Sequence, residues 1–129
     1  MKEKLKLYMI MLGCTPEDRF TEQHDIFFGI AYSLKELIPK MNHIDAWREV
    51  TAVDNFSISI ESKNTSTTKD QLFFINLGGY KENEFEEYHY KTLTVAENMA
   101  LATKKAKSST FYKHFGFKGA TSHIDDKYG

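Results

Sequence analysis

The chain has 129 residues, a length typical of one domain, and 41% of them are hydrophobic, with seven glycines in addition. This composition is that of a globular protein and excludes disordered and fibrous classes. Seventeen basic against 18 acidic residues leave a formal charge of -1, too small to attract nucleic acid or an anionic membrane over the whole surface.

Cysteine content and the N-terminal residues indicate the compartment. The single cysteine, Cys14, cannot form an internal disulfide, which favours a reducing environment, and we expect a cytoplasmic protein. The apolar run over residues 7–14 is far shorter than the roughly 20 residues that cross a bilayer, so no membrane association is expected. The run resembles a lipoprotein signal, but it is at the short limit and Glu3 interrupts its basic start.

In chain order, residues 4–12 form a short apolar run followed by Gly13, which predicts a buried strand that ends at the glycine. Residues 24–32 are ambiguous, because their apolar run fits a helix nearly as well as a strand. Ser33 then opens a capping-box pattern with Glu36, which predicts a helix over residues 34–38. Asp54-Asn55 indicates a turn between a strand near residues 47–53 and the alternating residues 56–60.

The second half of the chain has a similar order. Residues 63–70 are polar and small and predict a mobile loop, and residues 71–77 predict a second buried strand that ends at Gly78. Residues 91–95 alternate polar and β-branched side chains, which is typical of a half-buried strand. Asn98 is a suitable N-cap for a helix over residues 99–107.

The two halves are related by an internal repeat. Residues 7–31 and 72–96 align without a gap at an offset of 65, and nine of the 25 positions are identical. The tripeptide His-Ile-Asp at residues 43–45 recurs at residues 123–125. Because one backbone should serve both copies, the ambiguous residues 24–32 are predicted to form a strand like residues 90–96.

These elements predict an α+β fold in which a strand-strand-helix module is duplicated and the sheet is mixed but largely antiparallel. We expect residues 1–129 to form a single domain made of two related halves, about 1–62 and 70–129. The second half offers no counterpart to the strands that follow residue 45, so we expect the natural chain to continue past Gly129.

Several of these segments resemble a known family. The similar segments are Leu12-Gly13, residues 22–25, 27–30, 43–50 and 72–80, and residues 43–50 are the most specific. Together they resemble the bacterial family called domain of unknown function 1543. The resemblance implies a bacterial protein with a duplicated module and no assigned activity, and it provides no catalytic residues.

A duplicated polar set is the natural candidate for a site. It consists of Glu22, His24, His43 and Asp45 in the first half and Glu87, His89, His123 and Asp125 in the second. Imidazole and carboxylate together suit a divalent metal ion, an acid and base pair, or a bound ligand. The preferred interpretation is a structural role, in which each histidine is partly buried and hydrogen-bonded at the start of a strand or after a helix. Spacing in the sequence does not bring His43 or Asp45 to His24.

Other residues are interpreted structurally. Trp47 is expected in the core, and Cys14 is expected in a loop with no role. Residues 111–117 resemble both an acetyltransferase segment and the aromatic strand of an RNA-recognition motif, but neither pattern is complete. Residues 98–124 contain five lysines and no acidic residue, which we interpret as a solvated basic face, so nucleic acid is not expected as a partner.

The sequence therefore predicts a binding or assembly module whose ligand and cofactor it does not identify. Self-association is expected, because antiparallel modules leave sheet edges to be covered. The alternative is a metal-dependent or acid/base enzyme that uses the duplicated Glu, His and Asp residues, and the sequence leaves the choice open.

Overall fold

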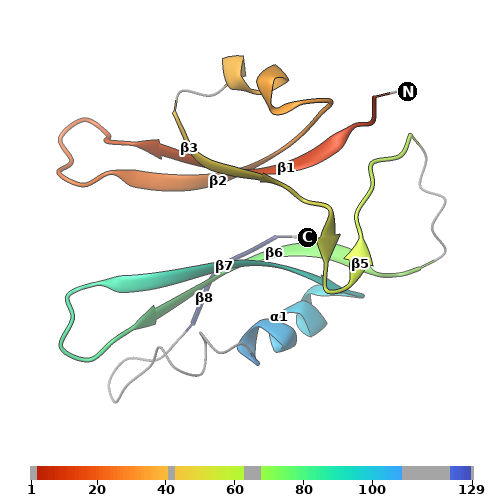
Figure 1. Ribbon diagram of the computed structural model, residues 1–129. Coiled ribbons are helices and arrows are strands. Elements are labelled where there is room, and N and C mark those ends of the chain that lie inside the picture. The colour runs from red at the N-terminus through yellow and green to blue at the C-terminus, as the bar shows by residue number, and fades with distance from the viewer. Residues whose placement is uncertain (1–2, 41–42, 63–67, 109–122, 129) are drawn as a thin grey trace. The chain divides into compact units, whose positions relative to one another are not determined.

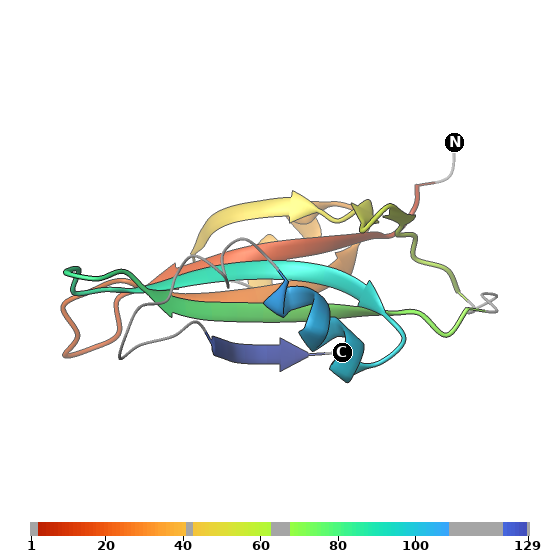
Figure 2. The same ribbon diagram turned by 90° about the horizontal axis from the view of Figure 1, so that it is seen from below.

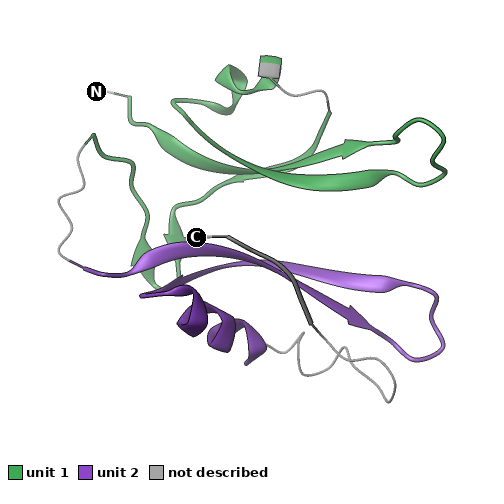
Figure 3. Ribbon diagram, turned by 180° about the vertical axis from the view of Figure 1, so that it is seen from behind, with its two compact units in different colours: residues 1–65 green, residues 66–129 purple. Residues whose placement is uncertain are grey.

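The structure is a computed structural model that describes residues 3–40, 43–62, 68–108 and 123–128 (Figure 1). The chain divides into two compact units, Met1–Thr65 and Ser66–Gly129, called unit 1 and unit 2 below (Figure 3). Each unit contains a three-stranded sheet, and every strand pairing in the described ranges is antiparallel. The fold is α+β, as predicted. Within those ranges, no helix has both the length and the apolar character needed to span a membrane.

Unit 1 is built on strands β1 (Lys6–Cys14), β2 (Gln23–Ala31) and β3 (Ile44–Glu49), with β1 in the middle of the sheet. Alternate residues of β1 point to opposite faces, as the period of a strand requires. Tyr8 and Ile10 are buried on one face, where they form a core.

The predicted helix after Ser33 is wrong. Two short 3-10 segments replace it, η1 (Leu34–Glu36) and η2 (Ile38–Lys40). Pro39 lacks an N–H group and disfavours the α conformation of the residue before it, so an α-helix cannot continue past Leu37. The capping box does not form either, since Glu36 accepts a hydrogen bond from the Tyr32 N–H at 3.1 Å and Ser33 makes no side-chain cap. Leu37 nevertheless completes the core of unit 1.

The turn predicted at Asp54-Asn55 is confirmed, because both residues adopt a positive φ between β4 (Ala52–Val53) and β5 (Phe56–Ser57). The flanking strands are shorter than predicted. The strand that contains Trp47 is β3, which pairs with β1 and begins at Ile44.

Unit 2 contains β6 (Gln71–Tyr80), β7 (Glu87–Ala96), the helix α1 (Met99–Lys107) and β8 (His123–Tyr128), with β6 in the middle of the sheet. The helix lies along the β6–β7 hairpin in two perpendicular views (Figures 1 and 2). Strand β8 was not predicted. It pairs with β6 much as β3 pairs with β1, so the second half does contain a counterpart of β3.

Helix α1 follows the sequence prediction. The Asn98 side chain accepts a hydrogen bond from the Leu101 N–H at 2.9 Å, and the helix spans the predicted residues. Ala102 and Ala106 are buried against Ile75 and Leu77, and these residues belong to the core of unit 2. Small alanine side chains allow the helix to lie close to the sheet.

The prediction that the equivalent segments of both halves are strands is confirmed by β2 and β7. The two glycines do not end their strands, however. Gly13 pairs with His24 inside the β1–β2 ladder, and Gly78 pairs with His89 inside the β6–β7 ladder. Each glycine thus faces a histidine of the duplicated polar set.

A β-bulge interrupts each sheet at its third strand. Met11 pairs with Ala46 but Leu12 pairs with Ile44, so Asp45 is the extra residue of the bulge in unit 1. In unit 2, β8 has the same irregularity opposite Asn76 and Leu77, and Asp125 is the extra residue. Bulges bend a strand and redirect side chains, and they are frequent next to functional sites.

Two further interpretations need correction. Trp47 is half-exposed rather than buried, and its ring lies edge-on to Tyr8 with the centroids 6.0 Å apart. Cys14 is exposed, as a loop residue would be, but it is the last residue of β1. Residues 111–117 and most of the predicted loop at residues 63–70 lie outside the described part of the chain.

Candidate functional site

The centre of the unit 1 site is the carboxylate of Asp45, which contacts two histidines. Asp45 Oδ1 lies 2.7 Å from His43 Nε2, and Asp45 Oδ2 lies 2.9 Å from His24 Nε2. Both distances are those of charge-assisted hydrogen bonds. The two oxygens of the Asp45 carboxylate therefore contact two different imidazoles. His24 belongs to β2, and His43 directly precedes β3.

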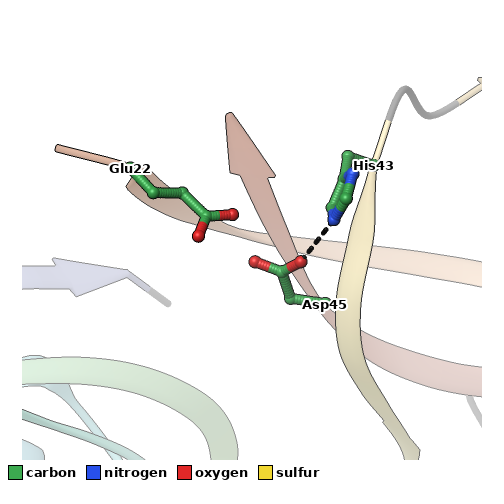
Figure 4. Close-up of side chains that lie close together, drawn as sticks. All are labelled: Glu22, His43 and Asp45. Carbon is green, nitrogen blue, oxygen red and sulfur yellow. Dashed lines mark ion pairs between the residues drawn. The ribbon is translucent and has the colours of Figure 1, made fainter. Parts of the chain in front are cut away.

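A fourth side chain, Glu22, approaches from the start of β2. Glu22 Oε1 lies 3.8 Å from His24 Nε2, and the Glu22 carboxylate points toward that of Asp45 (Figure 4). One ligand atom from each of Glu22, His43 and Asp45 can be chosen so that all three lie within 4.8 Å of one another. We call Glu22, His24, His43 and Asp45 the unit 1 site.

The pairing of β1 with both neighbours brings these residues together. His24 lies opposite Gly13 on β2, and the Gly13 N–H donates to the His43 carbonyl at 3.1 Å, so both histidines flank the same glycine. The bulge then places the Asp45 side chain over Gly13, on the sheet face opposite to Ile10 and Tyr8.

Gly13 leaves the space that the carboxylates occupy. A Cβ atom at this position would lie 2.8 Å from Asp45 Cγ and would overlap Asp45 Oδ2 and Glu22 Oε1. Any side chain at residue 13 would therefore compete with the site. The sequence prediction assigned Gly13 only to the end of a strand, although its identity with Gly78 in the repeat was a signal for this role.

Solvent reaches the unit 1 site. The side chain of His43 is 63% exposed, and that of Asp45 is 23% exposed. Because His43 is exposed, its imidazole can exchange partners without an unfolding step. The arrangement can thus bind a cation or exchange a proton with a solvent-borne molecule.

Unit 2 holds a related but different group. Glu87 Oε1 lies 2.6 Å from His89 Nε2, and the Tyr80 hydroxyl donates to Glu87 Oε2. Strand β8 places His123 opposite Gly78. The side chains of His123 and Asp125 lie outside the described part of the chain. Tyr80 was not among the predicted site residues, because the repeat has Thr15 at the corresponding position.

Tyr88, beside the Glu87–His89 pair on β7, has a perturbed pKa. Its hydroxyl donates to Glu84 Oε1 at 2.6 Å. This hydrogen bond, together with desolvation and the negative charges of Glu84 and Glu86, raises the pKa of Tyr88 to about 12. The phenol therefore stays protonated well above neutral pH.

Comparisons with known proteins agree with this fold. Residues 19–60 match the family Domain of Unknown Function (DUF1543). The resemblance drawn from the sequence is thus confirmed for residues 19–60, which include all four residues of the unit 1 site, whereas the similar segments at Leu12-Gly13 and residues 72–80 lie outside the match. No curated protein matches the chain.

A solved structure extends the comparison beyond the DUF1543 segment. The crystal structure of a protein Il1583 from Idiomarina loihiensis is similar to the chain with a TM-score of 0.62 and 21% identity. The similarity covers 94% of this chain and 86% of that protein. At this identity, the likeness shows the fold.

Proposed function

We propose that the protein is a binding module whose unit 1 site takes a divalent cation of the zinc class. The supporting observation is that the Asp45 carboxylate lies within hydrogen-bond distance of the Nε2 atoms of His24 and His43, with Glu22 beside it. Two imidazoles and two carboxylates form a donor set that suits Zn²⁺ and related borderline cations.

The distances within the unit 1 site are compatible with such an ion. Zinc bonds of about 2.1 Å at tetrahedral angles separate ligand atoms by roughly 3.4 Å. The contacts of Asp45 with the histidines, at 2.7 and 2.9 Å, are shorter than this separation, and the contact between Glu22 and His24, at 3.8 Å, is longer. Coordination would require the two Asp45 contacts to lengthen and the Glu22–His24 contact to shorten, and Glu22, His43 and Asp45 already offer ligand atoms within 4.8 Å of one another.

The site is also open enough for an ion to enter. The side chains of His43, Glu22 and His24 are 63%, 47% and 40% exposed, so an ion can reach their ligand atoms from solvent. A cation would also remove the repulsion between the Glu22 and Asp45 carboxylates, which point toward each other. Binding would therefore stabilise unit 1 by the usual linkage between ligand binding and folding.

Zinc titration of the purified full chain tests the proposal. Isothermal titration calorimetry with ZnCl₂ should detect binding to the wild type, and the variants D45N and H43Q should lose the unit 1 event or weaken it at least ten-fold, as removal of a ligand requires. The control is E49Q, which changes an exposed carboxylate of the same strand whose nearest ion-pair partner, Lys6, is 4.0 Å away. Circular dichroism should show that all variants remain folded.

The result that overturns the proposal is equal zinc affinity in wild type, D45N and H43Q, or no binding by the folded wild type. In that case the His43–Asp45 contact would support the alternative function, an acid/base enzyme, because a carboxylate-bound imidazole is a common general base.

We further propose that the two units arose by duplication. The support is the sequence repeat together with the common strand order, the glycine that faces a histidine and the aspartate in each bulge. A chimera in which residues 72–96 replace residues 7–31 tests this origin. If the two backbones are equivalent, the transplanted hairpin should still pair with β3. Loss of the fold in that chimera would argue against it.

Self-association in the cytoplasm is the remaining part of the proposal. Phe20 and Phe85 occupy equivalent positions in the β1–β2 and β6–β7 connections and are fully exposed. Both connections are predominantly acidic, with Arg19 and Lys81 as their basic residues, whereas the outer face of α1 presents Leu101 beside Lys104. These surfaces are complementary in charge, so a second copy of the chain is the expected occupant.

Sedimentation equilibrium tests this assembly. The wild type should form dimers or larger species, whereas a variant with F20S and F85S should be monomeric at the same concentration and equally stable. A monomeric wild type, or a double variant that associates like the wild type, would rule out assembly through these residues.

A further inference from the structure

We infer that unit 2 holds a second zinc-class cation site, with Glu87 and His89 as ligands and Tyr80 as a positioning residue. This inference rests on the function proposed for unit 1, but it concerns different residues. It implies that one chain binds two ions.

The hairpin of unit 2 supplies the first half of this site. Glu87 and His89 stand at the same spacing as Glu22 and His24, and His89 faces Gly78 as His24 faces Gly13. The Glu87 and His89 side chains are 32% and 35% exposed, compared with 47% and 40% for Glu22 and His24. The unit 2 pair is therefore somewhat more sheltered, and its 2.6 Å contact is shorter than the 3.8 Å contact in unit 1.

The backbone of β8 supplies the second half. Gly78, near the end of β6, pairs with two histidines: His89 of β7 on one side and His123 of β8 on the other. The bulge in β8 makes Asp125 the extra residue, which is the register position of Asp45 in unit 1. The topology thus brings Glu87, His89, His123 and Asp125 to one end of one sheet.

Tyr80 distinguishes the second site from the first. Its hydroxyl donates to Glu87 Oε2, while Glu87 Oε1 contacts His89. A carboxylate whose one oxygen is held by a phenol keeps a fixed orientation and can still coordinate an ion through the other oxygen. Removal of a hydrogen bond of this kind to a metal ligand typically lowers metal affinity by about 10- to 100-fold.

Zinc stoichiometry measured on the full chain tests the inference. After equilibration with ZnCl₂ and removal of free ions, the wild type should retain two equivalents by mass spectrometry under native conditions. H43Q and H89Q should each retain one, and the double variant should retain none. E82Q is the matched control, because it removes an exposed carboxylate of the same hairpin and should leave two equivalents bound.

The outcomes separate the two proposals. One equivalent in the wild type that H43Q removes and H89Q leaves in place would overturn the second site and leave the unit 1 proposal intact. One equivalent that H89Q removes and H43Q leaves in place would support the second site and contradict the first. The second site would also be contradicted if the wild type retained no zinc. The same holds if it retained one equivalent that H43Q and H89Q each removed, because both histidines would then serve a single ion.

The variant Y80F tests the positioning role. Y80F should still bind two ions. The zinc affinity of the unit 2 site, which H89Q abolishes, should fall by about ten-fold or more. The affinity of the unit 1 site, which H43Q abolishes, should be unchanged. Unchanged affinity at both sites would show that Tyr80 does not position Glu87. Thermal unfolding of Y80F without zinc separates this effect from a general loss of stability.

Discussion

Gly13 lies directly against the carboxylate of Asp45, so the absence of a side chain at residue 13 is part of the unit 1 site. A Cβ atom on Gly13 would lie 2.8 Å from Asp45 Cγ and would overlap the nearest carboxylate oxygen. The glycine sits inside β1 at the point where the bulge of β3 redirects Asp45. Strand, bulge and glycine act together to place one carboxylate between two histidines.

The variant G13A tests this relationship. We expect it to remain folded, because the displaced atoms are mostly the ends of side chains and alanine is favoured over glycine in a strand by about 0.5 to 1 kcal/mol. Zinc affinity at the unit 1 site should fall at least ten-fold, because Asp45 and Glu22 must move apart. Calorimetric titration measures the loss, and wild-type affinity in G13A would show that the carboxylates do not need this space.

A second prediction concerns the core of unit 1. Leu37 is buried, and it packs so closely on Gly29 that a Cβ atom there would lie 2.8 Å from Leu37 Cδ1. L37A should lower the free energy of unfolding by about 2 to 4 kcal/mol, as expected for a buried leucine. The neighbouring Ile38 is half-exposed, so I38A is the control and should cost less than about 1 kcal/mol. Urea denaturation monitored by the fluorescence of Trp47 compares them, and equal effects would contradict the assignment of Leu37 to the core.

The third prediction concerns the start of α1. N98A removes the acceptor for the Leu101 N–H and should destabilise unit 2 by about 1 kcal/mol. N98D restores an acceptor at the same position and should be close to the wild type. Thermal unfolding followed by circular dichroism distinguishes these outcomes, and an N98A variant as stable as N98D would show that the cap contributes little.

The sequence predicted elements whose signals are local. Asn98 identified the start of α1, and Asp54-Asn55 identified a turn, because each effect depends on a few neighbouring residues. The helix expected after Ser33 failed for a local reason too, since Pro39 outweighs the capping pattern. Comparison of the two halves decided residues 24–32, which no local pattern could.

The site itself depends on contacts that are distant in the sequence. His24 meets Asp45 because β3 pairs with the far side of β1, and neither spacing nor composition specifies that pairing. The bulge at Asp45 shifts the register by one residue, which an alternating pattern does not reveal. The repeat therefore identified the residues of the site, while the sheet topology was needed to bring them together.

The last prediction concerns the ionisation of Tyr88 at high pH. The negatively charged Glu84, which accepts the Tyr88 hydrogen bond, opposes formation of a second negative charge, and the pKa of Tyr88 rises from its ordinary value of 10.0 to about 12. Because the folded protein holds this proton more tightly than the unfolded chain, the contribution to stability is complete below pH 10 and is lost as the pH rises to about 12. Carbon-13 NMR of labelled tyrosine should show one ring that titrates late and disappears in Y88F. In E84Q that titration should shift down toward 10, whereas in the control E82Q it should stay near 12. A Tyr88 ring that titrates at the ordinary value in the wild type would contradict the assigned hydrogen bond.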